Sequence, residues 1–108
     1  MAALLGWKAP AASASMLIVW SATAIANLVG IHEYIEQDKP AAARRVARKI
    51  LASIERLASH PHLGHPGREP GTRELVVSGT PYIVPYKIYK GRLAILAVLH
   101  AARLNRPE

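Results

Sequence analysis

Three short apolar runs rich in Val, Ile, Leu and Tyr follow one another in the last third of the chain. The runs are residues 73–77, 82–89 and 92–100, separated by Ser-Gly-Thr-Pro at 78–81 and by Lys-Gly at 90–91. Such runs, broken by turn-forming residues, predict a three-stranded antiparallel meander. The third run is apolar on both faces, which predicts a central strand. Pro85 has no backbone N–H, so its strand should be bulged, locally unpaired or at an edge there.

One strand and two helices are predicted ahead of the meander. Residues 16–20 (MLIVW) form a continuous apolar run, typical of a strand buried on both faces. Ser21 is a good N-cap for a helix that ends near residue 37. Pro40 opens a second helix, over about residues 41–59, and the short break between the two helices predicts an antiparallel hairpin. The apolar stripe of the first helix is expected to consist of Ile25, Leu28, Val29, His32 and Ile35.

The predicted order is β-α-α-β-β-β, an α+β fold in which a helical hairpin packs on one face of a small twisted sheet. A chain of 108 residues is long enough for one modest core, so residues 16–108 are expected to form a single domain. Residues 1–15 are rich in Ala and Ser without a clear period, and we expect a flexible leader or upstream extension there. Residues 60–72 contain three prolines and three glycines and are expected to be a loop.

The charge balance is strongly basic, with 14 Lys and Arg against 7 Asp and Glu. An excess of this size on a small domain favours a polyanion or an acidic protein as partner. The absence of cysteine excludes disulfides, thiolate zinc sites and cysteine nucleophiles, and it is compatible with the cytoplasm. Residues 9–31 are uncharged and long enough to cross a bilayer. They are dominated by Ala and contain Pro10 and Asn27, so no membrane span is expected.

Six pieces of the sequence resemble, in order and at the right separations, the RelE/ParE superfamily of toxins from bacterial type II toxin–antitoxin modules. The pieces are IVWS at 18–21, HEYI at 32–35, PAAA at 40–43, GTRELVV at 71–77, GTPYIVPYKI at 79–88 and VLHAAR at 98–103. The resemblance covers about residues 16–103 and implies the same β-α-α-β-β-β fold. It also implies growth arrest that a cognate ParD- or RelB-like antitoxin neutralises by wrapping the toxin with an acidic C-terminal segment.

The two branches of this superfamily differ in target. ParE-like toxins poison DNA gyrase, whereas RelE-like toxins cut mRNA in the ribosomal A site without a metal, using convergent basic and aromatic side chains. This chain departs from the ribonuclease pattern, because Arg73 is followed by Glu74 where paired lysines belong. Ile83 also follows Tyr82 where an arginine belongs. The sequence therefore resembles the ParE-like branch more closely, which implies a cytoplasmic gyrase-binding toxin that is not itself an enzyme.

The ribonuclease alternative and a third interpretation, a toxin-like fold kept as a non-toxic binding module, stay open. If the ribonuclease alternative holds, the resemblance assigns catalysis to Arg73, Tyr86, Lys87, His100 and Arg103. The basic residues expected to meet the antitoxin or the target are Arg44, Arg45, Arg48 and Arg103, although the second-helix arginines can equally be a solubilising face.

Two further groups of side chains call for an interpretation. The His60, His62 and His65 imidazoles are close in sequence, but no carboxylate or thiol stands at ligand spacing, so no metal or cofactor is expected. Along the second run of the meander, Tyr82 and Tyr86 share one strand face and Tyr89 lies on the other. Exposed tyrosines can stack on nucleic-acid bases, but at least one face is packed on helices. One or two of these tyrosines are therefore expected in the core.

Overall fold

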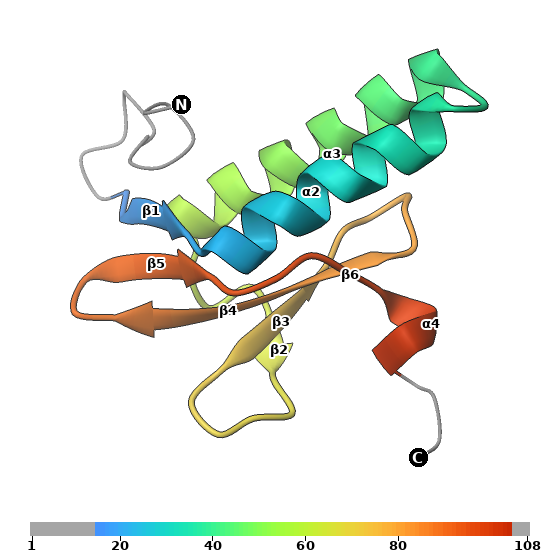
Figure 1. Ribbon diagram of the computed structural model, residues 1–108. Helices are drawn as coiled ribbons and strands as arrows, with labels where there is room; N and C mark the ends of the chain where they lie inside the picture. Colours follow the sequence, from blue (N-terminus) through green and yellow to red (C-terminus); the bar gives the residue numbers. More distant parts are fainter. Residues whose placement is uncertain (1–14, 105–108) are drawn as a thin grey trace.

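The computed structural model describes residues 15–104, in which two antiparallel helices cover one face of a twisted sheet (Figure 1). The elements are β1 (Leu17–Trp20), α2 (Ala22–Glu36), α3 (Pro40–Ser59), β2 (His65–Pro66), β3 (Arg73–Val76), β4 (Tyr82–Tyr89), β5 (Arg92–Ile95), β6 (Leu99–His100) and α4 (Ala101–Leu104). The predicted α+β fold is confirmed, with two short elements, β2 and α4, added to it and the third predicted run divided into β5 and β6. The leader expected over residues 1–15 lies, except for Ser15, outside the described residues.

The helices begin where their sequence signals place them. The Ser21 hydroxyl accepts the backbone N–H of Ala24 at 2.9 Å and so caps α2. Pro40 is the first residue of α3, a position at which a missing N–H leaves no helical hydrogen bond unmade. The two helices differ in burial. Helix α3 packs a row of side chains along its length into the core, whereas Ala24 is the one buried residue of α2. Val29 was expected on the buried stripe of α2 and is instead 49 % exposed.

The sheet has the strand order β1-β5-β4-β3-β2, and β6 also pairs with β4. Strand β1 runs parallel to β5, and the other pairs are antiparallel. The β5 strand lies between β1 and β4, so the central position predicted from its two apolar faces is confirmed. The chain thus crosses from β1 through both helices before it builds the rest of the sheet.

The third run of the meander is two strands, not the single strand predicted over residues 92–100. The register of β4 against its partner changes by one residue between β5 and β6, so residues 96–98 form a bulge. The bulge lies opposite Pro85, which cannot donate to the ladder, and the predicted interruption is confirmed. The Pro85 carbonyl still accepts the N–H of Leu96 at 2.9 Å. The loop expected over residues 60–72 is also wrong in part, because β2 within it pairs with β3.

The core lies between the helices and the covered face of the sheet. Its largest fully buried side chains are Tyr86, Ile50, Ile54, Leu57, Leu93, Ile95, Val77 and Val84. Along β4 the predicted division of tyrosines is confirmed, since Tyr82 and Tyr86 are buried while Tyr89 is 55 % exposed on the uncovered face. No helix within residues 15–104 is long and apolar enough to cross a membrane.

Candidate functional site

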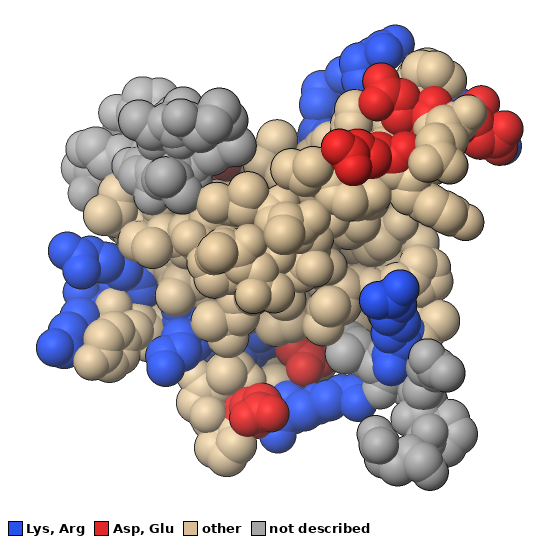
Figure 2. Space-filling model, viewed as in Figure 1, with Lys and Arg blue, Asp and Glu red and all other residues tan. Residues whose placement is uncertain are grey.

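Helix α2 presents an apolar surface that the rest of the described chain, residues 15–104, does not cover. Its sequence carries no Asp, Glu, Lys or Arg before Glu33. A helix that is apolar all round is normally buried. Here Tyr34 is 74 % exposed, and Val29 is half exposed. Figure 2 shows a broad area without acidic or basic side chains over the first half of this helix. An uncovered apolar area of this kind is typical of interaction surfaces.

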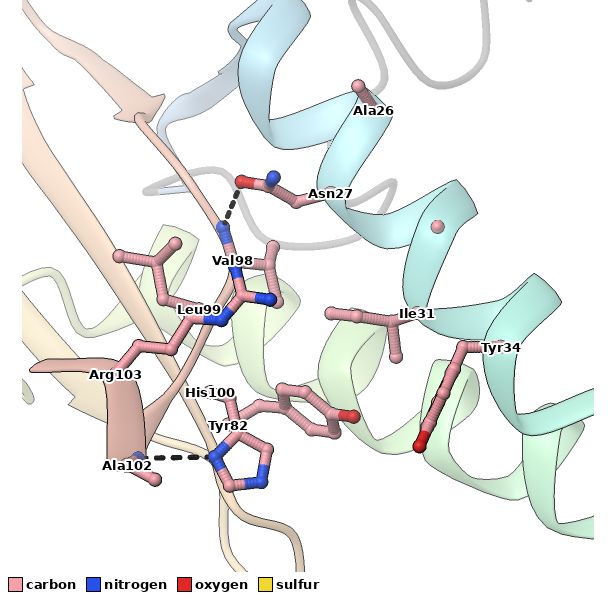
Figure 3. A pocket seen from close by; sticks show the side chains of 11 residues that line it. Ala26, Asn27, Ile31, Tyr34, Tyr82, Val98, Leu99, His100, Ala102 and Arg103 are labelled. Carbon is pink, nitrogen blue, oxygen red and sulfur yellow. Dashed lines mark hydrogen bonds between the residues drawn. The ribbon is translucent and has the colours of Figure 1, made fainter.

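A groove of about 630 Å³ runs along this helix (Figure 3). It lies between α2 and the segment that leads from the bulge through β6 into α4, with Tyr82 of β4 between the two walls. We call it the α2 groove, and its lining residues are Ala26, Asn27, Gly30, Ile31, Tyr34, Tyr82, Val98, Leu99, His100, Ala102 and Arg103. Two elements that are far apart in the sequence therefore form its two walls.

Two polar side chains of the α2 region hold the opposite wall in place. The Asn27 Oδ1 atom accepts the N–H of Val98 at 3.0 Å, as Figure 3 shows. The Ser21 hydroxyl, while capping α2, donates to the carbonyl of Leu96 at 2.9 Å. Both bonds go to the bulge at residues 96–98, where the backbone has left the strand ladder. The break in the third strand is thus what fixes the groove in a preformed shape.

The polar groups of the groove cluster around Tyr82. Its ring meets the ring of His100 edge to face, with centroids 5.5 Å apart. The Nδ1 atom of His100 accepts the N–H of Ala102 at 3.1 Å and so caps the turn of α4. In Figure 3 the hydroxyls of Tyr34 and Tyr82 face each other across the groove, and the Arg103 guanidinium lies along the opposite wall. The groove therefore combines apolar walls with two phenols, an imidazole and one cation.

The environment of Tyr82 predicts a measurable pH effect. Burial raises the pKa of Tyr82, and the Tyr34 hydroxyl, a like charge once ionised, raises it further. An unfolded tyrosine ionises at about pH 10, so above that pH the unfolded chain loses a proton that the native chain retains. The contribution of Tyr82 to stability is therefore complete below pH 10 and falls as the pH rises towards the raised pKa.

A titration that follows tyrosinate absorbance is expected to show a high-pH component that Tyr82→Phe removes. The same substitution should make the free energy of unfolding less dependent on pH above pH 10. If the component that Tyr82→Phe removes instead titrates at about pH 10, like an unfolded tyrosine, the described environment of Tyr82 is contradicted.

Arg73 and Tyr86, two of the five residues considered for catalysis, form a structural clamp. They pair across β3 and β4. Tyr86 is fully buried, and its hydroxyl donates to the carbonyl of Pro61 at 2.7 Å and accepts the N–H of Gly64 at 2.9 Å. The Arg73 guanidinium donates to the carbonyl of Gly64. These groups hold the loop that follows α3. Tyr86, a catalytic candidate only under the ribonuclease alternative, has its ring in the core.

The remaining three candidates lie in two other places. Lys87 is exposed and points to the face of the sheet opposite Tyr86, its neighbour in β4. His100 and Arg103 lie together at the α2 groove. Tyr86 and Tyr82 are four residues apart along β4, a distance of about 13 Å, so the clamp is not part of the groove. The structure thus brings together only His100 and Arg103 of the five.

The other predicted residues lie outside the groove. Arg44, Arg45 and Arg48 are exposed on α3 and do not line it. Within residues 15–104 no group of three or more His, Cys, Asp or Glu side chains is arranged to hold a metal ion.

The sequence interpretation missed the α2 wall of the groove, which is formed by Ala26, Asn27, Gly30, Ile31 and Tyr34. Their three- and four-residue spacing places them on one helix face. The sequence signals that could have pointed to this wall were Asn27, a polar residue, and Gly30, both within a mainly apolar stretch of the helix.

Comparison with known proteins gives concordant results. A family model described as the ParE toxin of the type II toxin–antitoxin system parDE matches residues 18–105. The putative toxin Y4kP of Sinorhizobium fredii is 45 % identical over 84 residues, which is 78 % of this chain and 86 % of that protein. Toxin RelE2 of Caulobacter vibrioides is 38 % identical over 87 residues, 81 % of this chain and 97 % of that protein.

A solved structure, described as the chromosomal ParDE TA system from P. aeruginosa, has a similar fold. The TM-score is 0.74 at 23 % sequence identity, and the match covers 82 % of this chain and 98 % of that one. At this level of identity the likeness concerns the fold.

Proposed function

This chain belongs to the ParE toxin family of type II toxin–antitoxin systems, and we propose that it arrests growth in the cytoplasm by binding DNA gyrase. The family also implies an antitoxin partner. The observation that carries the proposal is the match to the parDE toxin family over residues 18–105, which includes both helices, the sheet and the α2 groove. The scattering of the candidate catalytic residues supports a toxin that acts by binding rather than by catalysis.

The α2 groove is the proposed docking site of the antitoxin. An acidic C-terminal segment of the antitoxin would lay apolar side chains against α2, as amphipathic segments do in apolar grooves. One of its carboxylates would meet Arg103, whose guanidinium suits a bidentate contact. The net charge of +7 supports an acidic partner. Arg44, Arg45 and Arg48 offer further contacts on α3 for the antitoxin or for gyrase.

Expression of the chain in bacteria without an antitoxin tests the proposal. Growth is expected to stop, with DNA synthesis falling before protein synthesis, because a toxin that traps gyrase on cleaved DNA interrupts replication first. Incorporation of labelled thymidine and labelled leucine over time measures the order of the two effects. Co-expression of the cognate antitoxin should restore growth. An earlier fall in protein synthesis would contradict gyrase as the target, and uninterrupted growth would favour a non-toxic binding module.

A ribosome-dependent mRNA endoribonuclease is the second candidate. It is favoured by the presence of both His100 and Arg103 in the lining of one groove, and by the similarity to a protein named Toxin RelE2. The substitution Arg103→Ala removes the cation of the groove. Under this candidate it should abolish growth arrest and mRNA cleavage while the domain still folds. Retained toxicity of a folded Arg103→Ala variant would reject this candidate.

A further inference from the structure

One aromatic and three basic side chains lie together at the turn between β4 and β5. The Nζ atoms of Lys87 and Lys90 are each 5.3 Å from the centroid of the Tyr89 ring. Arg92 lies directly opposite Tyr89 in the strand ladder, so the two side chains share one side of the sheet. All four residues are exposed. We call Lys87, Tyr89, Lys90 and Arg92 the hairpin patch.

The hairpin patch stands on a rigid frame. Tyr89 is the last residue of β4 and Arg92 the first of β5, so only two residues form the connection. Lys90 and Gly91 both have positive φ, 50° and 74°, as a two-residue type I′ turn requires. The twist of such a turn matches the twist of the two strands that it joins. The hydrogen-bonded ladder between β4 and β5 therefore continues up to the turn. The Tyr89 ring is thus held at the end of the sheet on regular backbone.

The basic side chains of the hairpin patch have no carboxylate partner within residues 15–104. No Asp or Glu occurs between Glu74 and Glu108 in the sequence. Among the described residues, none of the three cations of the patch forms an ion pair. Figure 2 shows Lys and Arg gathered at the end of the sheet where β4 turns into β5. A cation–π contact at an exposed site contributes only about 0.5–1 kcal/mol, so these lysines remain available to a phosphate.

We propose that the hairpin patch binds a single-stranded nucleic acid, with a base stacked on Tyr89 and phosphates held by Lys87, Lys90 and Arg92. A single strand is the ligand that uses both parts of the patch, because its bases offer a flat face and its backbone regularly spaced charges. A duplex keeps its bases stacked inside. An acidic protein segment would use the cations but leave the ring without a stacking partner.

The hairpin patch is separate from the α2 groove. Tyr89 and Tyr82 stand at opposite ends of β4, seven residues or about 23 Å apart. Tyr82 also faces the helices, whereas Tyr89 lies on the uncovered side of the sheet. Binding at the hairpin patch therefore does not depend on the groove being a docking site or on gyrase being the target.

Fluorescence anisotropy with the full chain and labelled oligothymidylate or oligouridylate tests the proposal, and the two probes distinguish DNA from RNA. Tyr89→Ala is expected to weaken binding about tenfold, the loss typical of one stacked base, whereas Tyr89→Phe keeps the ring and the affinity. The triple variant Lys87→Gln/Lys90→Gln/Arg92→Gln should reduce the slope of log affinity against log salt by about two, since each single-strand phosphate contact contributes about 0.7.

The matched control is Arg44→Gln/Arg45→Gln/Arg48→Gln, which removes the same charge from α3. It should keep most of the affinity for both probes. An equal loss in this control, or wild-type affinity in Tyr89→Ala, would overturn the proposal in favour of unspecific charge attraction. A duplex that competes as well as the single strand would overturn it too. Thermal unfolding of each variant verifies that it is folded.

Discussion

Gly64→Ala is expected to destabilise the domain by about 3 kcal/mol or more, the largest effect on stability that we predict. A Cβ atom at this position would lie 2.7 Å from the carbonyl oxygen of Glu74 and 2.7 Å from both the ring and the hydroxyl of Tyr86. Neither neighbour can move away easily, because Glu74 belongs to β3 and the Tyr86 ring is fully buried. Relief of the clash would also break the hydrogen bond from the Gly64 N–H to the Tyr86 hydroxyl.

Two other glycines provide matched controls for urea unfolding. At Gly71 a Cβ meets nothing within 4 Å but φ is +82°, so Gly71→Ala should lose only about 1–2 kcal/mol. At Gly30, inside α2, a Cβ also meets nothing within 4 Å, and Gly30→Ala should gain about 0.5–1 kcal/mol. If Gly64→Ala unfolds at the same urea concentration as Gly71→Ala, the close packing of Gly64 against the clamp formed by Arg73 and Tyr86 is contradicted.

Gly30→Leu is expected to weaken antitoxin binding about a hundredfold or more while leaving the toxin at least as stable as the wild type. Gly30 lines the α2 groove and is exposed, so a leucine there would occupy space proposed for the antitoxin. Leucine is also a better helix former than glycine by roughly 0.8 kcal/mol. A loss of binding would therefore not come from unfolding. A hundredfold change corresponds to about 2.7 kcal/mol, within the range of a central interface residue.

Titration calorimetry with the cognate antitoxin measures this effect, and rescue of growth by co-expressed antitoxin provides a second readout. Thr23→Leu places the same side chain on an exposed position of α2 outside the groove and should bind normally. The smaller Gly30→Ala change should have a small effect. Normal affinity in Gly30→Leu would show that the antitoxin docks elsewhere.

Most of the fold could be predicted because its signals are local. Ser21 and Pro40 mark the starts of the two helices by their own hydrogen-bonding chemistry, and alternation along residues 82–89 places Tyr89 on the uncovered face. The break in the third strand could not be predicted from its own residues, which are apolar throughout. It arises because Pro85, in the neighbouring strand, interrupts the ladder.

Less of the candidate site could be predicted, because it depends on which distant segments meet. His100 and Arg103 were identified from their place at the end of a strand. The other wall of the groove comes from α2, where apolar residues on every side conceal which face is buried, so Val29 was placed wrongly. Tyr86 was considered for catalysis by family resemblance, while the packing of its strand face put it in the core.

A gyrase assay tests the central claim most directly. Purified protein is combined with gyrase, ATP and plasmid DNA, and the products are scored for supercoiling and for trapped cleaved DNA. The proposed function predicts a dose-dependent loss of supercoiling together with cleaved DNA, both reversed by the cognate antitoxin. Unchanged supercoiling and no cleaved DNA, from a chain that arrests growth when expressed, would contradict gyrase as the target and favour mRNA cleavage at the ribosome.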